Sequence, residues 1–192
     1  MDDRAPDARV AVFGSGGGSP EDLERARLLG AGLARAGFAV LNGGYGGTME
    51  AVAAGARQAG GRAIGVTCAE FTFRSGPNSH LSEVIEAPTL FARLERLVRE
   101  ASAYVALPGG NGTLVEISLA WECLRKGILP PRPLVAWRDP WRSIFERLEE
   151  GPYLGVGADL FTWVEGVDEA VAAVRDRVPL VLAGPSRARG TD

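Results

Sequence analysis

Three glycine-rich segments in this chain of 192 residues could hold a phosphate, because each follows a short apolar run and precedes a helical pattern. The segments span residues 14–18, 43–47 and 109–112. Glycine lets the backbone turn sharply and approach a ligand closely, and the free N–H groups at the start of a helix attract an anion. One such loop is sometimes only a tight turn. Three in one small chain predict a ligand that carries a phosphate group.

The spacing of these loops does not match the standard nucleotide-binding motifs. Ser19 stands where a third glycine after Gly14 and Gly16 would complete G-x-G-x-x-G. The apolar run before the second loop ends in Asn42, not in the acidic residue that binds a dinucleotide ribose. The chain also lacks G-x-x-x-x-G-K-[ST], and its only lysine, Lys126, follows no glycine loop. A NAD site is therefore disfavoured and a P-loop NTPase is excluded.

The third loop runs directly into a carboxylate, Glu116. Thr113 and Glu116 have the S/T-x-x-E spacing of a capping box, which predicts a helix from Thr113 to Lys126 and a structural role for Glu116. In the functional interpretation, the same carboxylate faces the ribose of a ligand whose phosphate lies on the loop. The two interpretations are compatible, because both place Glu116 at the start of the helix.

An arginine on the preceding helix is the second candidate for chemistry. The helix predicted over residues 88–101 has an apolar stripe of Leu90, Leu94, Leu97 and Val98. At 100° per residue, Arg93 lies on the flank of this stripe, whereas Arg96 falls well outside it. A flank position can reach over the edge of a sheet into a cleft. Arg93 is therefore a candidate site residue, and Arg96 is expected in solvent.

Two further features allow a structural or a functional interpretation. Glu50 lies in the first turn of the helix predicted over residues 48–59, where a carboxylate stabilises the helix dipole or contacts a ligand. Phe71 and Phe73 stand alone in an irregular segment, where they either stack on a base or attach the segment to the core.

The residue types that bind metal ions are sparse. His80 is the only histidine, and no second His or Cys lies near it in the sequence. Cys68 and Cys123 are far apart and belong to no C-x-x-C spacing. Neither a metal site nor a disulfide framework is predicted.

The elements that must position these residues alternate between strands and helices. Strands are predicted over residues 9–13, 38–41, 62–67, 83–86, 103–107, 134–137 and 161–164, and helices over 19–37, 48–59, 88–101, 113–126, 140–149 and 167–177. This alternation is typical of an α/β fold, and predicts a Rossmann-like three-layer domain with a mostly parallel sheet. We expect one domain over residues 1–183 and a flexible tail over 184–192.

The composition and net charge of the chain indicate which kinds of partner it is expected to bind. Hydrophobic residues make up 46% of the chain and charged residues 23%, and the formal net charge is −3. This weak acidity argues against a protein that coats nucleic acid or a membrane surface. The start of the chain has no apolar signal region, and no run of about 18 apolar residues occurs. We expect a cytoplasmic protein with no nucleic-acid partner and no membrane contact.

The third loop and the helix after it also carry a specific motif. Residues 108–116 read P-G-G-N-G-T-L-V-E and fit P-G-G-x-G-T-x-x-E. The chain resembles the LOG-like ("lonely guy") proteins over roughly residues 9–150. Residues 43–51, G-G-Y-G-G-T-M-E-A, are similar to the family's G-G-G-x-x-G-x-M loop, and Arg93 falls where the family has its catalytic arginine.

The resemblance implies an enzyme that acts on nucleoside 5′-monophosphates. Members of the family are cytokinin riboside 5′-monophosphate phosphoribohydrolases or broader nucleoside-monophosphate nucleosidases, which release a free base and ribose 5-phosphate. Some members bear a lysine decarboxylase label, but that chemistry normally needs a Schiff-base lysine, and Lys126 lies at a helix end. Some relatives of the fold carry molybdenum cofactor, so a non-catalytic carrier of such a phosphate-bearing ligand is the alternative.

The resemblance also assigns roles to residues. Arg93 and Glu116 are the catalytic candidates. The expected phosphate-binding residues are Gly109, Gly110, Gly112 and Thr113, with Gly43, Gly44, Gly46, Gly47 and Thr48 on the opposite side. Further expected contacts to the substrate are Ser15, Gly16, Glu50 and Asn111. No cofactor and no metal are implied. The family further implies a homodimer whose subunits complete each other's sites, for which the Ala- and Gly-rich helix over residues 48–59 would permit close packing.

The sequence departs from the family pattern beside both catalytic candidates. The common Arg-Lys pair is Arg93-Leu94, and the frequent Glu-Glu ending is Val115-Glu116. The Met-His-Glu segment before the arginine is replaced by residues 90–92, Leu-Phe-Ala. The phosphate loop therefore matches the family more closely than the residues around it.

Overall fold

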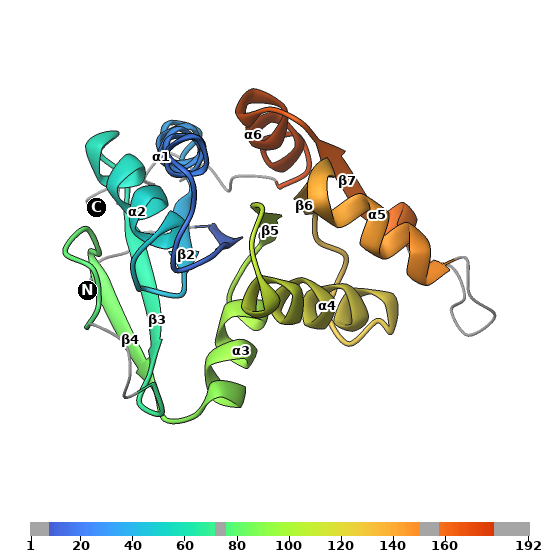
Figure 1. Cartoon of the computed structure of the whole chain (residues 1–192), viewed down its shortest axis with the longest axis horizontal. Coiled ribbons are helices and arrows are strands. Elements are labelled where there is room, and N and C mark those ends of the chain that lie inside the picture. Colours follow the sequence, from blue (N-terminus) through green and yellow to red (C-terminus); the bar gives the residue numbers. More distant parts are fainter. Residues whose placement is uncertain (1–7, 72–75, 150–157, 179–192) are drawn as a thin grey trace, which may run out of the picture.

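A computed structural model of the chain describes residues 8–71, 76–149 and 158–178, and these form a single seven-stranded sheet (Figure 1). The strand order is β4-β3-β2-β1-β5-β6-β7, and every neighbouring pair is parallel. The strands are β1 (Arg9–Phe13), β2 (Ala39–Asn42), β3 (Ala63–Cys68), β4 (Glu83–Ala87), β5 (Ala103–Ala106), β6 (Leu134–Trp137) and β7 (Phe161–Val164). The predicted fold class is confirmed, and each strand lies within one residue of its expected bounds.

Helices cover both faces of this sheet. They are α1 (Pro20–Arg35), α2 (Thr48–Gln58), α3 (Leu90–Arg99), α4 (Asn111–Arg125), α5 (Arg138–Glu149) and α6 (Val167–Arg175), with a short 3₁₀ turn, η1, at Ala158–Leu160. Helices α1, α2 and α6 lie on one face, and α3 and α4 lie on the other (Figure 1). The ring of Trp121 on α4 meets that of Phe145 on α5 edge-on, with centroids 5.2 Å apart. No helix among the described residues is long and apolar enough to span a membrane.

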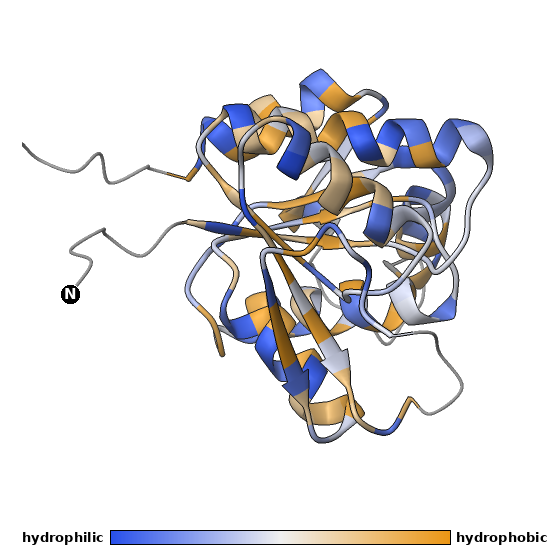
Figure 2. Cartoon of the chain, turned by 90° about the vertical axis from the view of Figure 1, so that its left-hand side faces the viewer, coloured by the Kyte–Doolittle hydropathy of each residue, from blue (hydrophilic) through white to orange (hydrophobic). Residues whose placement is uncertain are grey.

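Burial on both faces explains why the strands read as continuous apolar runs. Every residue of β2, β3, β5 and β6 is buried, as are the last four residues of β1. Figure 2 shows these hydrophobic strands enclosed between helices with hydrophilic outer surfaces. Strand β4, at one edge, alternates between half-buried and exposed residues before ending at the buried Ala87. The expected domain end at residue 183 and the tail lie outside the described residues.

The chain reverses direction across the sheet at β1. From β1 it proceeds outward through β2, β3 and β4, and then crosses to β5 on the other side of β1. The carboxyl ends of β1 and β5 are therefore adjacent where the connections diverge. Such a topological switch point is where open α/β sheets bind ligands.

Helices α1 and α2 lie in close contact because glycine occurs at their crossing. A Cβ added at Gly30 would lie 2.0 Å from the carbonyl oxygen of Val52, and one at Gly55 would lie 1.9 Å from that of Arg27. The buried side of α2 is otherwise formed mainly by small and apolar residues, including Val52, Ala53 and Ala56. The small residues of α2 therefore have a packing partner within the same chain.

We predict that Gly30→Ala destabilises the protein. The added methyl group meets a backbone carbonyl, so the two helices must separate, and we expect a loss of about 1–3 kcal/mol in the free energy of unfolding. This loss exceeds the helix-propensity gain of up to about 1 kcal/mol that alanine offers. Urea unfolding measures it. Gly17→Ala, where a Cβ has no atom within 4 Å, is the control with a change of at most about 0.5 kcal/mol. Equal midpoints for Gly30→Ala and the wild type would contradict the crossing described here.

Candidate functional site

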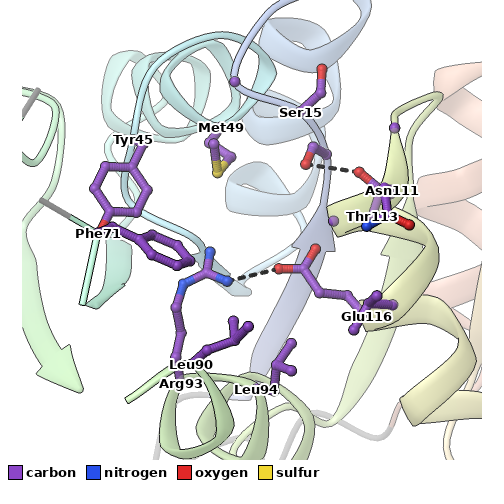
Figure 3. Close-up of a pocket in the computed structure, with 15 residues that line it drawn as sticks. Ser15, Tyr45, Met49, Phe71, Leu90, Arg93, Leu94, Asn111, Thr113 and Glu116 are labelled. Carbon is purple, nitrogen blue, oxygen red and sulfur yellow. Dashed lines mark hydrogen bonds and ion pairs between the residues drawn. The ribbon is translucent and has the colours of Figure 1, made fainter. Parts of the chain in front are cut away.

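A cleft of about 350 Å³ lies at the carboxyl ends of the central strands (Figure 3). Its walls come from the first loop, the start of α2, helix α3 and the first turns of α4. The lining residues are Gly14, Ser15, Gly16, Tyr45, Met49, Phe71, Leu90, Arg93, Leu94, Gly110, Asn111, Gly112, Thr113, Val115 and Glu116.

About half of the residues predicted for the site line this cleft. These are Ser15, Gly16, Arg93, Gly110, Asn111, Gly112, Thr113 and Glu116. The other predicted residues are absent from the lining, namely Gly43, Gly44, Gly46, Gly47, Thr48, Glu50 and Gly109. From the second loop and α2, the residues that line the cleft are Tyr45 and Met49.

The second loop supports the first loop from behind. Gly47 has φ +68°, and a Cβ there would lie 2.3 Å from backbone atoms of Gly16 and Gly17. The hydroxyl of Thr48 accepts a hydrogen bond from the N–H of Ser15 at 2.9 Å and donates one to the Ser15 carbonyl at 3.2 Å. These contacts fix the backbone of the first loop and leave its outer side open to the cleft.

The end of β2 holds the second loop in place through Asn42. This side chain is fully buried; its amide donates to the carbonyl of Met49 at 3.1 Å, and its oxygen accepts from the N–H of Gly44 at 2.7 Å. Asparagine at the end of β2 is thus a structural clamp for the loop, where a dinucleotide-binding protein would have its ribose-binding acid.

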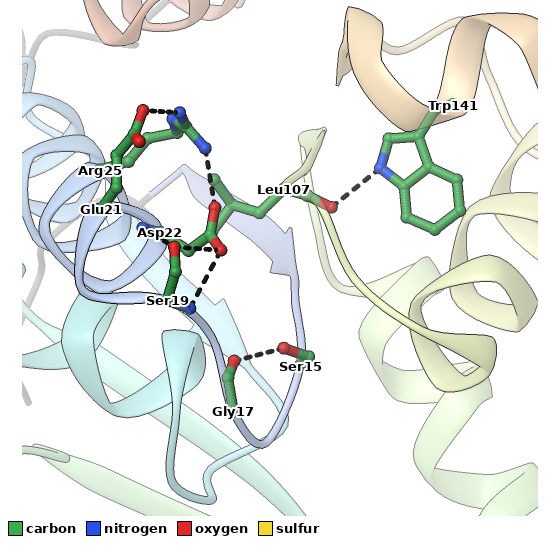
Figure 4. Close-up of polar contacts among 8 residues, drawn as sticks. All are labelled: Ser15, Gly17, Ser19, Glu21, Asp22, Arg25, Leu107 and Trp141. Atoms are coloured by element: carbon green, nitrogen blue, oxygen red, sulfur yellow. Dashed lines mark hydrogen bonds and ion pairs between the residues drawn. The ribbon is translucent and has the colours of Figure 1, made fainter.

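Helix α1 begins immediately after the first loop and is capped by Ser19 (Figure 4). The Ser19 hydroxyl accepts from the N–H of Asp22, and the Asp22 carboxylate accepts from the N–H of Ser19. Arg25 donates to Asp22 at 2.9 Å. Inside the loop, the Ser15 hydroxyl donates to the carbonyl of Gly17. Both ends of the loop are therefore held by local hydrogen bonds.

The predicted capping box at Thr113 is wrong. Helix α4 begins at Asn111 with Gly110 as its N-cap, and no side chain caps it. Thr113 is buried inside the first turn, and its hydroxyl donates to the carbonyl of Gly14 at 2.9 Å. The glycines before Thr113 allow the helix to start two residues earlier than the motif suggests. Thr113 consequently connects α4 to the first loop, and the first-turn N–H groups, which have no intrahelical acceptor, are left uncapped by any side chain.

Arg93 and Glu116 meet in the floor of the cleft. Arg93 is 6% exposed and Glu116 is 6% exposed. Nη1 of Arg93 donates to Oε1 of Glu116 at 3.2 Å, and Nε of Arg93 donates to the carbonyl of Val66 at 2.8 Å. A Cβ on Gly43 would lie 2.0 Å from Nη2 of Arg93, so only glycine leaves room for the guanidinium there. Gly43 thus contributes to the site by making space for Arg93.

Burial alters the acidity of Glu116. It raises the pKa of this carboxyl from its ordinary value of 4.5 to about 7, although the guanidinium of Arg93 acts in the opposite direction. A carboxyl with a pKa near neutrality is half ionised at the pH where most enzymes work, which suits it to accept or donate a proton.

Two aromatic residues that the motifs do not identify complete the wall beside Arg93. The Phe71 ring lies 5.7 Å from Cζ of Arg93 and 5.9 Å from the Tyr45 ring (Figure 3). The Tyr45 hydroxyl accepts from the N–H of Cys68 at 2.9 Å. Phe73 lies outside the described residues, and His80 is exposed. The only sequence signal for Phe71 is an isolated aromatic residue in a polar segment.

A second, apolar groove adjoins the cleft. It lies between α3 and α4 and is lined by Phe91, Leu94, Glu95, Val98, Arg99, Val115, Leu119, Cys123, Ile128 and Leu129. Leu94 and Val115, the residues that replace the family's lysine and first glutamate, line both the groove and the cleft. Phe91 is 83% exposed on this groove.

The raised pKa of Glu116 predicts how stability varies with pH. The folded protein binds a proton that the unfolded chain releases between about pH 4.5 and 7, so the unfolding free energy falls as the pH rises through this window. We expect Glu116 to contribute a fall on the order of 3 kcal/mol between pH 4.5 and 8. Glu116→Gln should therefore show a flatter profile in urea unfolding than the wild type.

A carboxylate on the same helix provides the control for this measurement. Glu122 is part-exposed and pairs with Arg125 at 2.7 Å. Glu122→Gln should keep the wild-type dependence on pH. Parallel profiles for the wild type and Glu116→Gln would show that Glu116 ionises at its ordinary pH in the folded protein.

Comparison with known proteins shows which family the chain belongs to. The family model described as "SLOG cluster4 family" matches residues 7–130. A cytokinin riboside 5′-monophosphate phosphoribohydrolase from Mycobacterium marinum is 30% identical over 162 residues, covering 80% of this chain and 86% of that protein. A protein of the same name from Mycobacterium tuberculosis is 34% identical over 122 residues, or 63% of this chain and 64% of that protein.

The solved structure of a carrier protein is also similar to this chain. The molybdenum cofactor carrier protein of Chlamydomonas reinhardtii superposes with a TM-score of 0.71 at 26% identity, covering 88% of this chain and 97% of that one. The family match spans most of the described residues, including all three glycine loops, α3 and α4. The resemblance predicted from the P-G-G-x-G-T-x-x-E motif is confirmed, and the chain belongs to the SLOG cluster4 family.

Proposed function

We propose that the protein hydrolyses the N-glycosidic bond of nucleoside 5′-monophosphates and releases a free base and ribose 5-phosphate. The observation that carries this proposal is the buried Arg93–Glu116 pair one helical turn from the uncapped start of α4. The relatives named as phosphoribohydrolases support the same reaction.

The 5′-phosphate would bind at the start of α4. The N–H groups of Asn111, Gly112 and Thr113 have no acceptor within the helix, and the helix dipole favours an anion at this end. The Thr113 hydroxyl is engaged with Gly14 and would support the phosphate site indirectly. The residues expected to bind phosphate that do not line the cleft would instead shape and support the loops that face it; they are Gly43, Gly44, Gly46, Gly47, Thr48 and Gly109.

Glu116 would supply the charge that the reaction requires. Cleavage breaks the bond between C1′ and the base nitrogen, whose electron pair leaves with the base, and the ribose passes through an oxocarbenium-like state. A carboxylate beside C1′ stabilises that positive charge and accepts a proton from the attacking water, by analogy with glycosidases. Arg93 would orient the carboxylate through the bond that it donates.

We predict that Glu116→Gln separates chemistry from binding. The substitution keeps the size of the side chain and an acceptor for Arg93, but removes the charge. We expect kcat to fall by a factor on the order of 10²–10³ with little change in KM, because the ground-state ribose is neutral. A panel of nucleoside 5′-monophosphates, assayed by chromatography of the released base, provides the measurement.

Controls for this assay follow from the site. Glu122→Gln, on the outer side of the same helix, should leave kcat unchanged, and nucleosides without the 5′-phosphate should release little base. Near-normal kcat for Glu116→Gln on the best substrate would remove Glu116 from the mechanism. The roles of Arg93 and the loops would then need another explanation.

A carrier of a phosphate-bearing pterin such as molybdenum cofactor is the second candidate. The similarity to the Chlamydomonas carrier protein favours it, as do Leu94 and Val115 in place of the polar residues of the enzymes. Absorbance and fluorescence of the purified protein would reveal a bound pterin. A bound pterin together with no base release across the panel would make the carrier the better assignment.

We also propose that the chain forms a homodimer through the apolar groove between α3 and α4. The close contact with α1 accounts for the small residues of α2, whereas Phe91, Val115 and Ile128 are exposed at the groove. Glu95 and Arg99 pair at 2.9 Å along α3, and a two-fold axis that passes between them would place each opposite the other residue of a second copy. Such a dimer would also border the cleft, because Leu94 and Val115 line both.

We predict that Phe91→Asp yields a monomer. A charge on the wall of the groove opposes burial there, whereas the exposed position of Phe91 leaves folding unaffected. Sedimentation at micromolar concentration would show a dimer for the wild type and a monomer for the variant. Leu148→Asp, at an exposed position on α5, is the control that should stay dimeric. A monomeric wild type would refute the proposal that two copies of the chain associate through this groove.

A further inference from the structure

An aromatic residue three positions beyond the end of β3 lies beside the Arg93–Glu116 pair. Phe71 lines the cleft, and its backbone N–H donates to the carbonyl of Cys68 at 3.1 Å. The Tyr45 hydroxyl is held by the N–H of the same Cys68, and the two rings meet at 41°. Both aromatic residues are thus anchored at one point, the carboxyl end of β3.

This anchor places the Phe71 ring over the guanidinium of Arg93. The distance from Cζ to the ring centroid is 5.7 Å, within the range of a cation–π contact. Figure 3 shows the ring beside the guanidinium, on the side away from Glu116. The guanidinium also donates hydrogen bonds to the carbonyl of Val66 and to the carboxylate of Glu116, and the absence of a side chain at Gly43 leaves room for it.

We propose that Phe71 is a positioning residue that covers the Arg93 guanidinium and keeps water away from the Arg93–Glu116 pair. Its ring already contacts a cation and another aromatic ring, so we assign it to this cover and not to stacking on the base of a substrate. The chain of contacts runs from Cys68 through the two rings to Arg93, and from Arg93 to Glu116.

The consequence concerns the acidity of Glu116. Burial is the main cause of its raised pKa, and Arg93 of α3 is the charged group that opposes it. The other ionisable side chain that lines the cleft is Tyr45, whose hydroxyl accepts a hydrogen bond from the N–H of Cys68. Removal of the Phe71 ring should admit water and lower the pKa of Glu116 toward 4.5.

A titration of Glu116 itself tests this without any need for turnover. The carboxyl carbon of Glu116 is followed by ¹³C NMR from pH 4 to 9, and its signal is assigned by its loss in Glu116→Gln. We expect Phe71→Ala to lower the pKa by about one unit or more, and Phe71→Leu, which keeps apolar bulk, to lower it less. Phe71→Tyr and the exposed Leu28→Ala should match the wild type.

The outcomes separate three roles for Phe71. A lowered pKa in Phe71→Ala or Phe71→Leu, with wild-type circular dichroism, supports the cover. An unchanged pKa in both folded variants overturns it, and a raised KM with that unchanged pKa would assign Phe71 to base binding. If Phe71→Ala does not fold, Phe71→Leu decides alone. This inference rests on the proposed function. If the pKa of Glu116 shifts in the Phe71 variants but the protein releases no base, the hydrolase proposal is refuted and the role of Phe71 as a cover is kept.

Discussion

A guanidinium and a carboxylate buried together between two helices set the conditions for the whole cleft. Burying such a pair removes both charges from water, and their mutual attraction rarely outweighs that cost. The surroundings of Arg93 and Glu116 must therefore supply further partners. Val66 gives a carbonyl to Nε, Gly43 leaves room for Nη2, and Phe71 lies over the guanidinium. Because these groups lie in β3, in the second loop and just after β3, the pair constrains these segments together with α3 and α4, which carry it.

The layers of the fold could be predicted because burial leaves a direct trace in the sequence. Strands such as β5 and β6 are covered on both faces, so they appear as short apolar runs bounded by glycine or proline. The same reasoning found Arg93, since the flank of an amphipathic stripe is a geometric property of one helix. The motif around Gly110 predicted an anion site at the start of α4 and placed the first residue of the helix two positions too late.

Contacts between distant segments could not be predicted in this way. Thr113 has the spacing of a helix cap, yet its hydroxyl bonds to Gly14, 99 positions earlier in the chain. Phe71 and Tyr45 become neighbours only because both are fixed at the end of β3. Likewise, a small-residue helix such as α2 does not indicate whether its partner is another subunit or α1. Each of these contacts depends on which elements the topology brings together, and a local sequence pattern does not show which distant segments become neighbours.

The two apolar replacements next to the pair give the cleft its particular electrostatics. With Leu94 and Val115 in place of a lysine and a glutamate, Arg93 is the one side-chain cation recorded in contact with Glu116 among the described residues. An anion bound at the start of α4 would lie about one turn from Glu116 and would favour its protonated form, whereas Arg93 favours the ionised form. The balance between them is sensitive because the surrounding wall is apolar and screens little. A phosphate bound there and the Arg93 guanidinium would thus act on the ionisation of Glu116 in opposite directions, so the contacts that hold the guanidinium in place help to set that ionisation.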